Sequence, residues 1–314
     1  MNEIVAVFER GKLLALCSLA RESRLRGRYE QVGAKKLAEP GGCYFVDEAS
    51  LRVLVDALSH VEHSFTLGRV VVNSPSLRAV RNAQPHSGTL AVAVAGSCPY
   101  VDLIMQPENI DRMLGKHLRS DLRRARRKAE ALGAVDFEVI APQSETELLY
   151  LYEKFLRVEE PSWKGRAGTS LSLDPQRQAF FREYGTRATG KGILRMARMR
   201  IDGETVAMQY AVECGERFWL LKVGYDEAYR KCSPGHLLMY ETLRYTAEKG
   251  LRTYEFLGGA ADWTKRWTRT ERPTVTVDVC QTRVRCALSR LTRTGNYLGK
   301  RLRSEFKSLS LRYR

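Results

Sequence analysis

Apolar and polar residues alternate most clearly between residues 193 and 225. Apolar residues dominate 193–201 and 205–214, and the Asp202-Gly203 pair between them favours a two-residue hairpin turn. A second short turn, Gly215-Glu216, leads into another apolar run, Arg217–Tyr225. The pattern therefore predicts three consecutive antiparallel strands.

The residues that follow predict a β-α-β crossover. A turn at residues 230–236 opens a helix, with Ser233 as its cap and Pro234 in its first turn. A further strand is expected from Tyr254, and two strands joined through a helix usually run parallel. Unpaired N–H groups at the start of the helix suit a phosphate. An ordinary capped helix has the same pattern, so the pattern alone leaves both interpretations open.

The upstream sequence predicts alternating helices and strands. Asp47 is placed to cap a helix that ends near Ser59, and Ser74-Pro75 gives a second helix start. Strands are expected at residues 67–72, 90–95 and 100–105, which makes 43–105 an α/β unit. The first forty residues show no clear periodicity.

Residues 107–174 predict two long helices around a strand and a polar loop. The first helix spans 107–132 and ends at Gly133, and a strand follows at 134–140. The Ser144-x-x-Glu147 capping box opens the second helix, which stops at Pro161. Later elements are a loop at 162–169, a helix from Asp174 and a last strand at 274–281.

Together these elements predict an α/β (α+β) fold with a mixed, mainly antiparallel sheet flanked by helices. We expect an N-terminal α/β part at 1–106, a main domain at 107–282 and a basic amphipathic tail at 283–314.

The positive charge is concentrated in two segments. The formal net charge of the chain is +16. Residues 112–128 hold eight basic residues and one acidic residue, and 283–314 hold ten and one, so the two segments carry net charges of +7 and +9. Such patches attract the phosphates of a nucleotide, of tRNA or of an anionic membrane. A solvated helix face explains 112–128 equally well.

The cysteines, the histidines and the hydropathy of the chain indicate which cofactors and which cellular compartment to expect. Seven cysteines without CxxC spacing argue against a disulfide framework or a zinc ribbon. His60-x-x-His63 has no evident third ligand, so no metal is expected. Because the first residues lack a long apolar core and no run is long enough to span a bilayer, we expect a cytoplasmic protein, peripheral to the inner membrane if the tail binds there.

The turn before the crossover helix carries a family resemblance. Arg230, Ser233 and Gly235 stand in the places of the Gln/Arg-x-x-Gly-x-Gly/Ala pyrophosphate loop of the GNAT N-acetyltransferase superfamily. The meander, helix and strand around this turn are also similar to that superfamily. Ser233 departs from the family pattern, which usually has glycine there.

Residues 115–268 more closely resemble the CelD-like branch of that superfamily, which is associated with polysaccharide biosynthesis and related to FemAB aminoacyl transferases. The resemblance rests on several segments in order: 119–128, 160–165 with Gly168-Thr169, 224–226, 233–235, 255–259 and 265–267. In this branch an N-terminal half is commonly a second, degenerate copy of the same fold, which would suit 43–105.

The resemblance implies transfer of an acyl group from acetyl-CoA or another acyl-CoA to an amine or hydroxyl. Glu160 and Glu255 are the candidate bases, although a solvated or paired carboxylate is the more usual role of any one glutamate. Tyr225 is the candidate acid for the leaving thiolate, or a packing residue of its strand.

The expected donor and acceptor contacts come from three segments. Donor contacts are assigned to Lys222, Arg230, Ser233, Gly235 and His236. Substrate contacts are assigned to Trp163, Lys164, Lys265 and Trp267, because tryptophan faces stack on sugars and lysine neutralises acidic groups. The tryptophan near Lys265 fits a core position equally well.

Three functions compete. The first is an acyl-CoA-dependent N- or O-acyltransferase, an N-acetyltransferase by preference, acting on a glycan, a sugar precursor or a cell-envelope metabolite. The second is an aminoacyl-tRNA-dependent transferase of the FemAB kind, for which the basic helix suits an RNA backbone. The third is a non-catalytic GNAT-like protein whose tail, with leucines among Arg and Lys, docks to a membrane or an envelope assembly.

Overall fold

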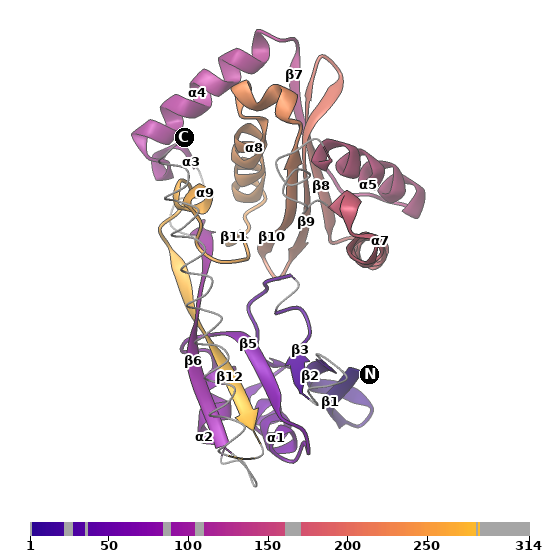
Figure 1. Cartoon of the computed structure of the whole chain (residues 1–314), viewed down its shortest axis with the longest axis vertical. Coiled ribbons are helices and arrows are strands. Elements are labelled where there is room, and N and C mark those ends of the chain that lie inside the picture. Colours follow the sequence, from indigo (N-terminus) through magenta and orange to yellow (C-terminus); the bar gives the residue numbers. More distant parts are fainter. Residues whose placement is uncertain are drawn as a thin grey trace. The chain divides into compact units, whose positions relative to one another are not determined.

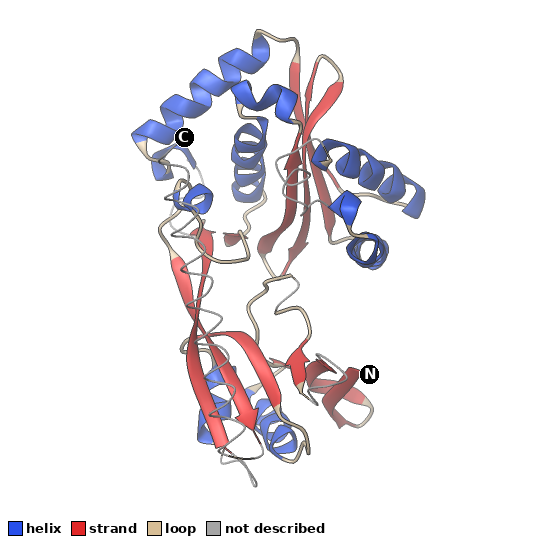
Figure 2. Ribbon diagram, viewed as in Figure 1, coloured by secondary structure: helices blue, strands red, loops and turns tan. Residues whose placement is uncertain are grey.

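The computed structural model describes residues 2–21, 28–34, 37–83, 89–103, 110–160, 171–280 and 282. The chain forms two compact units, Met1–Cys98 with Arg272–Arg314, and Pro99–Glu271. Figures 1 and 2 show the elements of each unit. We call them unit 1 and unit 2.

Unit 1 contains a mostly antiparallel sheet. Its strands are β1 (Asn2–Glu9), β2 (Lys12–Arg21), β3 (Tyr29–Gln31), β4 (Tyr44–Phe45), β5 (Phe65–Val71), β12 (Glu271–Cys280) and the first part of β6 (Thr89–Asp102). The hydrogen-bonded order is β1-β2-β3-β5-β12-β6, with β4 paired to β2. The β3–β5 pair runs parallel, whereas β1–β2, β2–β3, β2–β4 and β5–β12 run antiparallel.

Two helices pack against the unit 1 sheet, and both begin where the sequence predicts. In α1 (Glu48–Ser59), the Asp47 carboxylate accepts from the Ser50 amide at 2.8 Å. In α2 (Pro75–Asn82), the Ser74 hydroxyl accepts from the Leu77 amide at 3.3 Å. Their apolar sides join the buried strand residues in one core. Residue type at the helix start was therefore sufficient to place both helices.

Unit 2 contains the predicted meander and crossover. The strand order is β6-β11-β10-β9-β8-β7, with β7 (Val135–Ile140), β8 (Leu194–Ile201), β9 (Glu204–Cys214), β10 (Arg217–Tyr225) and β11 (Thr253–Glu255). β8, β9 and β10 pair antiparallel, and β10 and β11 pair parallel. At the β8–β9 turn both Asp202 (φ 50°) and Gly203 (φ 82°) have positive φ, as a tight hairpin turn of this kind requires.

Helices cover both faces of the unit 2 sheet. Figure 1 shows α4 and α8 on one side and α5 and α7 on the other. The long helices are α4 (Lys116–Glu130), α5 (Glu145–Glu159), α7 (Pro175–Gly190) and α8 (Pro234–Glu248), and the short ones are α3 (Ile110–Met113), α9 (Asp262–Lys265), η1 (Leu171–Leu173) and η2 (Glu227–Cys232). The predicted fold class, a mixed and mainly antiparallel sheet flanked by helices, is confirmed.

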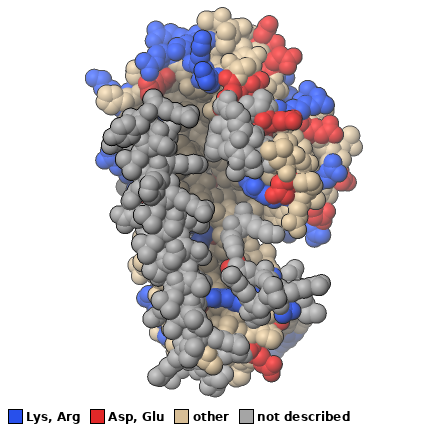
Figure 3. Space-filling view, viewed as in Figure 1, with Lys and Arg blue, Asp and Glu red and all other residues tan. Residues whose placement is uncertain are grey.

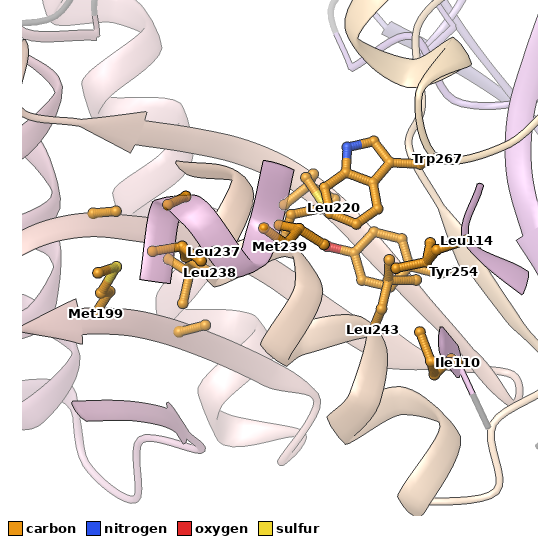
Figure 4. Close-up of a cluster of buried hydrophobic side chains, with 14 of the residues drawn as sticks. Ile110, Leu114, Met199, Leu220, Leu237, Leu238, Met239, Leu243, Tyr254 and Trp267 are labelled. Carbon is orange, nitrogen blue, oxygen red and sulfur yellow. The ribbon is translucent and has the colours of Figure 1, made fainter. Parts of the chain in front are cut away.

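The larger core lies between that sheet and the α4/α8 layer. Leu237, Leu238 and Leu243 of α8 meet Leu220 and Tyr254 of the strands (Figure 4). The indole of Trp267 is part of the same cluster and is 5% exposed. Because this core ends beside the open part of β10, it supports one wall of the candidate site.

The structure departs from the sequence predictions at several elements. The single helix expected at 107–132 is α3 and α4, separated at Leu114-Gly115, and the strands expected at 90–95 and 100–105 are one strand, β6. β12 pairs antiparallel with β5, so residues from Arg272 onward belong to unit 1. The prediction that residues 43–105 are a degenerate second copy of the fold stays a prediction.

Two further properties bear on function. In the described part of the chain, no helix has both the length and the apolar character to cross a bilayer. The thiols of Cys17, Cys43, Cys98, Cys214 and Cys232 are free, and Cys280 is disulfide-bonded.

Candidate functional site

Strand β10 has an open edge beside a bulge. β10 pairs with β11 from Arg217 to Trp219 and then continues to Tyr225, and we call the part beyond β11, 220–225, its open edge. The β10–β9 register shifts between Leu220 and Lys222, so Leu221 is an extra residue on β10. A bulge leaves the backbone of the extra residue outside the ladder, which frees polar groups for a ligand.

A cavity of about 690 Å³ lies along this open edge, entirely within unit 2. Its lining residues come from β10, η2, the start of α8 and the region of α9: Leu220, Leu221, Lys222, Val223, Gly224, Tyr225, Arg230, Ser233, Gly235, His236, Met239, Phe256, Trp263, Arg266 and Trp267. All five predicted donor-contact residues, together with Tyr225 and Trp267, are among them. The structure thus brings the two segments 222–236 and 263–267 to one cavity.

The cavity lining is basic and aromatic. Among its described residues are Lys222, Arg230, His236 and Arg266, and no aspartate or glutamate. Arg230 and Arg266 are exposed at its surface, whereas Met239 and Phe256 are buried. A basic and apolar lining suits an anionic ligand with a long uncharged part.

The start of α8 differs from the expected side-chain cap. Ser233 has φ 49° and ψ 53°, a left-handed conformation, and its side chain makes no capping hydrogen bond to this described helix. This conformation is what glycine adopts without strain, so it explains the glycine that the GNAT pattern usually has here. The Ser233 carbonyl accepts from the His236 and Leu237 amides at 3.0 and 3.2 Å. Within the described chain no backbone carbonyl accepts from Gly235, so its N–H is available to an anion.

Two glycines of the site lie in close packing contacts. A Cβ on Gly235 would lie 3.2 Å from Cδ1 of Tyr225, and one on Gly224 would lie 3.1 Å from Cβ of Glu159. The first contact presses the start of α8 onto the end of β10. The second brings the end of α5 onto the other face of β10. Gly235 therefore serves helix–strand packing as well as access to its own amide.

His236 lies in a charged and aromatic setting. Its ring stacks on the indole of Trp267 with centroids 5.7 Å apart. Burial lowers its pKa, the Arg266 charge lowers it further, and Asp121 opposes both effects. Asp121 accepts from Arg266 at 2.7 Å, which connects α4 to the cavity rim. At neutral pH His236 is therefore an uncharged hydrogen-bonding group.

The aromatic wall contains an unpaired donor. Nε1 of Trp267 is buried and has no hydrogen-bond partner among the described residues. Trp263 packs edge-to-face on Phe256 with centroids 5.6 Å apart and is 40% exposed. Unpaired buried donors are uncommon in folded proteins, so the indole N–H of Trp267 is a feature that a bound ligand could satisfy.

The two candidate bases lie in different environments. Glu255 is 1% exposed, accepts from the Thr253 hydroxyl at 2.7 Å and lies 3.7 Å from the Arg217 guanidinium. Glu160 follows α5 and is exposed. Neither is among the described residues that line the cavity.

Sequence reasoning missed Glu159, the neighbour of Glu160. Glu159 is 1% exposed, and its Oε2 accepts from the Leu171 amide at 2.8 Å. It lies beside Gly224 on the α5 face of β10, and its charge helps burial to raise the pKa of Tyr152 to about 12. The helical period could have found it, because Glu159 follows Phe155 by four residues and so falls on the buried face of α5.

The remaining predicted residues lie elsewhere. Lys265 is exposed and pairs with Asp262 at 3.5 Å, and it does not line the cavity. Trp163 and Lys164 lie outside the described residues. No cluster of three or more metal-ligating side chains occurs in the described ranges.

The α4 helix presents a basic surface beside the site. Its apolar face (Leu118, Leu122, Ala125 and Ala129) is buried. Asp121 and Glu130 neutralise Arg124, Arg126 and Arg266. Lys116, Arg119, Arg123 and Arg127 have no carboxylate partner in the described chain. Figure 3 shows lysine and arginine gathered over α4.

Comparisons with known proteins agree with this geometry. Residues 116–265 match the family model of the acetyltransferase (GNAT) domain. No match was found among curated protein sequences.

Several solved structures are similar in fold. One is the C-terminal domain (DUF2156) of a putative lysylphosphatidylglycerol synthetase from Agrobacterium fabrum, 13% identical, with a TM-score of 0.60 over 93% of this chain and 88% of that one. Another is L-PGS from Bacillus licheniformis, 14% identical, with a TM-score of 0.58 over 85% and 81%. FemX is 12% identical, with a TM-score of 0.55 over 88% and 87%. Unit 2 therefore has a GNAT-like fold, and its residues 116–265 match the family model of the acetyltransferase (GNAT) domain.

Proposed function

We propose that unit 2 transfers an acyl group from an acyl-CoA thioester, acetyl-CoA by preference, to an amine or hydroxyl acceptor. The observation that carries this proposal is the cavity along the open edge of β10, which runs from the bulge at Leu221 to the start of α8. An acyl-CoA has a long polar arm with amides and an anionic pyrophosphate. The backbone of the bulge residue Leu221 and the apolar part of the cavity lining suit the arm, and the basic helix start suits the pyrophosphate.

The positions of the lining residues support the roles that we assign to them. Arg230, Lys222 and the Gly235 amide are assigned to the donor phosphates, and the neutral His236 to a hydrogen bond. The backbone N–H of the bulge, which lies outside the ladder, is assigned to the oxyanion that forms at the thioester carbonyl.

In the proposed reaction, the acceptor nitrogen or oxygen attacks the thioester carbon and the thiolate leaves. Tyr225 donates its phenolic proton to that thiolate, and the attacking group loses a proton to a base. Glu160 remains the candidate base, because Glu255 is already held by Thr253 and Arg217. The expected acceptor is a glycan, a sugar precursor or another envelope metabolite.

The test of this proposal is a turnover assay with acyl-CoA donors. Release of free CoA thiol is measured with panels of amino sugars, polyols and amines, in wild type and in Tyr225→Phe. Acceptor-dependent thiol release, reduced in the variant by about 10²-fold or more, supports the proposal. The proposal is contradicted if no donor and acceptor pair gives release of CoA thiol and the protein also binds no acyl-CoA.

A second candidate is transfer of an aminoacyl group from an RNA ester, as in the FemAB-like alternative. Two observations favour it: the basic row on α4 and the similarity to a putative lysylphosphatidylglycerol synthetase, a protein named for a lysyl-bearing lipid. Residues four apart on α4 are about 6 Å apart along its axis, so the row can contact several phosphates.

This candidate is tested by fluorescence anisotropy with a labelled tRNA. The triple variant Arg119→Glu, Arg123→Glu and Arg127→Glu is compared with a matched triple variant on α7 and its C-cap residue, Arg182→Glu, Arg187→Glu and Lys191→Glu. Affinity that falls steeply with salt, and that is lost only in the α4 variant, supports RNA binding. Equal loss in both variants, or no binding at low salt, removes this candidate.

The basic tail at 283–314 lies outside the described residues. We propose that this tail attaches a cytoplasmic protein to an anionic membrane face. In the non-catalytic alternative, the protein has no transferase activity and only docks to a membrane or an envelope assembly. Co-sedimentation with anionic and neutral vesicles, with and without 283–314, tests it. Binding that survives removal of the tail excludes the assignment.

A further inference from the structure

Two buried cysteines of unit 1 lie in register with each other, Cys17 on β2 and Cys43 directly before β4. The antiparallel register of β2 and β4 pairs Ala15 with Phe45 and Leu16 with Tyr44. The next position in this register places Cys17 opposite Cys43. Each thiol shifts the pKa of the other, as expected for two thiols that lie close together. Both belong to the core of unit 1, with Cys17 0% and Cys43 9% exposed.

The pairing of Cys17 with Cys43 in the antiparallel register suits a disulfide bond. The Val46 amide donates to the Leu14 carbonyl at 2.9 Å, so the Leu14/Val46 pair is a hydrogen-bonded one. Because hydrogen-bonded and non-hydrogen-bonded pairs alternate along an antiparallel ladder, Cys17 and Cys43 form a non-hydrogen-bonded pair. Cα atoms in such pairs are about 4.5 Å apart, which lies within the range that disulfides span.

We propose that Cys17 and Cys43 are a reversible modification site, at which a small-molecule disulfide oxidises the two thiols to an intramolecular disulfide. This inference does not depend on the proposed acyl transfer, since every residue that lines the cavity lies in unit 2.

The chemistry proceeds by two exchanges. The Cys43 thiolate attacks one sulfur of the oxidant RSSR, forms a mixed disulfide and releases RS⁻. Cys17 then loses its proton and attacks Sγ of Cys43, which expels the second RS⁻. The two thiol protons neutralise the two released thiolates, so two protein thiols and RSSR give one protein disulfide and two RSH.

The surroundings assign the order of these steps. Cys43 is the more exposed of the two thiols, and the neighbouring Cys17 lowers its pKa, so Cys43 is the group that meets the oxidant. The same contact and burial raise the pKa of Cys17. Once Cys43 is in the mixed disulfide, its thiolate no longer opposes ionisation of Cys17.

Neighbouring contacts hold the pair in place. The Cys43 amide donates to the Ser76 hydroxyl at 3.1 Å, which ties this residue to α2. Cys17 lies within the longer strand β2, which pairs with β1 and β3. Since both backbones are fixed, bond formation requires rotation of side chains and little movement of strands.

The test uses the full chain equilibrated in glutathione buffers of increasing oxidised fraction, both in the native state and during refolding from urea. Remaining thiols are alkylated, and peptides are mapped without reduction. We expect a linked Cys17–Cys43 peptide that is about 2 Da lighter than the sum of its parts and that disappears on reduction. Exposed Cys214 serves as the reference thiol, because it should form only a mixed disulfide with glutathione.

A stability measurement accompanies the mapping. The bond closes a loop between β2 and β4, so oxidation should raise the apparent melting temperature by several degrees. Cys17→Ala should abolish this rise, and Cys98→Ala, which changes a buried thiol elsewhere in unit 1, should retain it. The proposal would be overturned if Cys17 and Cys43 were fully alkylated, under both native and refolding conditions, while Cys214 formed its mixed disulfide with glutathione. Preferential linkage of either residue to another cysteine would also overturn it.

Discussion

Gly224 of β10 lies directly against Glu159 of α5: a methyl group on Gly224 would be 3.1 Å from Cβ and 3.2 Å from Cα of Glu159. The contact fixes the end of α5 on the back of the strand that lines the cavity. Because backbone atoms oppose the added methyl, Gly224→Ala should lower the free energy of unfolding by about 1–3 kcal/mol. Urea denaturation measures this change.

Gly259→Ala is the matched control for that experiment. A methyl group on Gly259 would meet no heavy atom of the described chain within 4 Å, and the φ angle of this residue is not positive. The substitution should therefore leave stability almost unchanged. Equal effects of the two substitutions would show that the Gly224 contact is not a packing constraint.

Ser233 should respond to substitution unlike an ordinary helix cap. Its side chain makes no capping bond to the described helix, and its φ of 49° strains any residue with a Cβ. Ser233→Gly should therefore stabilise the protein by up to about 1 kcal/mol, and Ser233→Ala should change little. Thermal unfolding of both variants tests this. A loss of about 1 kcal/mol in Ser233→Ala would instead indicate a side-chain cap.

The pH dependence of stability should report the buried state of His236. Its pKa is lowered below the ordinary value of 6.5, chiefly by burial. As pH falls through that ordinary value, the unfolded chain binds a proton that the folded chain does not, so stability rises with pH across this window and falls on acidification. His236→Gln should show a weaker loss between pH 7.5 and 5.5 than wild type, and urea midpoints at both pH values test it. Parallel losses would contradict a buried neutral histidine.

Glu255 should contribute to stability more than to proton transfer. It is buried, accepts from Thr253 and lies 3.7 Å from the Arg217 guanidinium. Glu255→Gln should destabilise unit 2 by about 1–3 kcal/mol and leave kcat near the wild-type value. The measurement pairs urea denaturation with a pH–rate profile. A loss of about 10²-fold in kcat, together with loss of the acidic limb that protonation of a carboxylate base produces, would identify Glu255 as the base.

Local residue chemistry was sufficient to predict much of the fold. Asp47, Ser74-Pro75 and Asp202-Gly203 each determine a helix start or a turn through contacts within four residues, and the structure confirms all three. The β1–β2 hairpin was missed because Arg10 and Gly11 both adopt positive φ in a turn that lacks Asn-Gly or Asp-Gly.

The site was harder to predict because it depends on contacts between distant segments. The cavity lies beside β10 because its parallel neighbour β11 (Thr253–Glu255) is much shorter than β10 (Arg217–Tyr225). The local sequence of neither strand predicts this difference in length. Ser233 has the residue type of a cap but a left-handed backbone, which is imposed by the junction of η2 and α8. Arg266 reaches the cavity through its contact with Asp121, which is 145 residues earlier.

The central claim is that the cavity at the β10 edge holds an acyl-CoA, and direct titration calorimetry with acetyl-CoA and with free CoA tests it most directly. Wild type should bind with one site per chain, and Arg230→Glu should weaken binding by about tenfold or more, because a cation of η2 that lines the cavity becomes an anion. Lys265→Glu, an exposed lysine outside the cavity lining, is the matched control and should bind as wild type does. Absence of saturable binding of any acyl-CoA by folded wild type, or equal weakening in both variants, would contradict the claim.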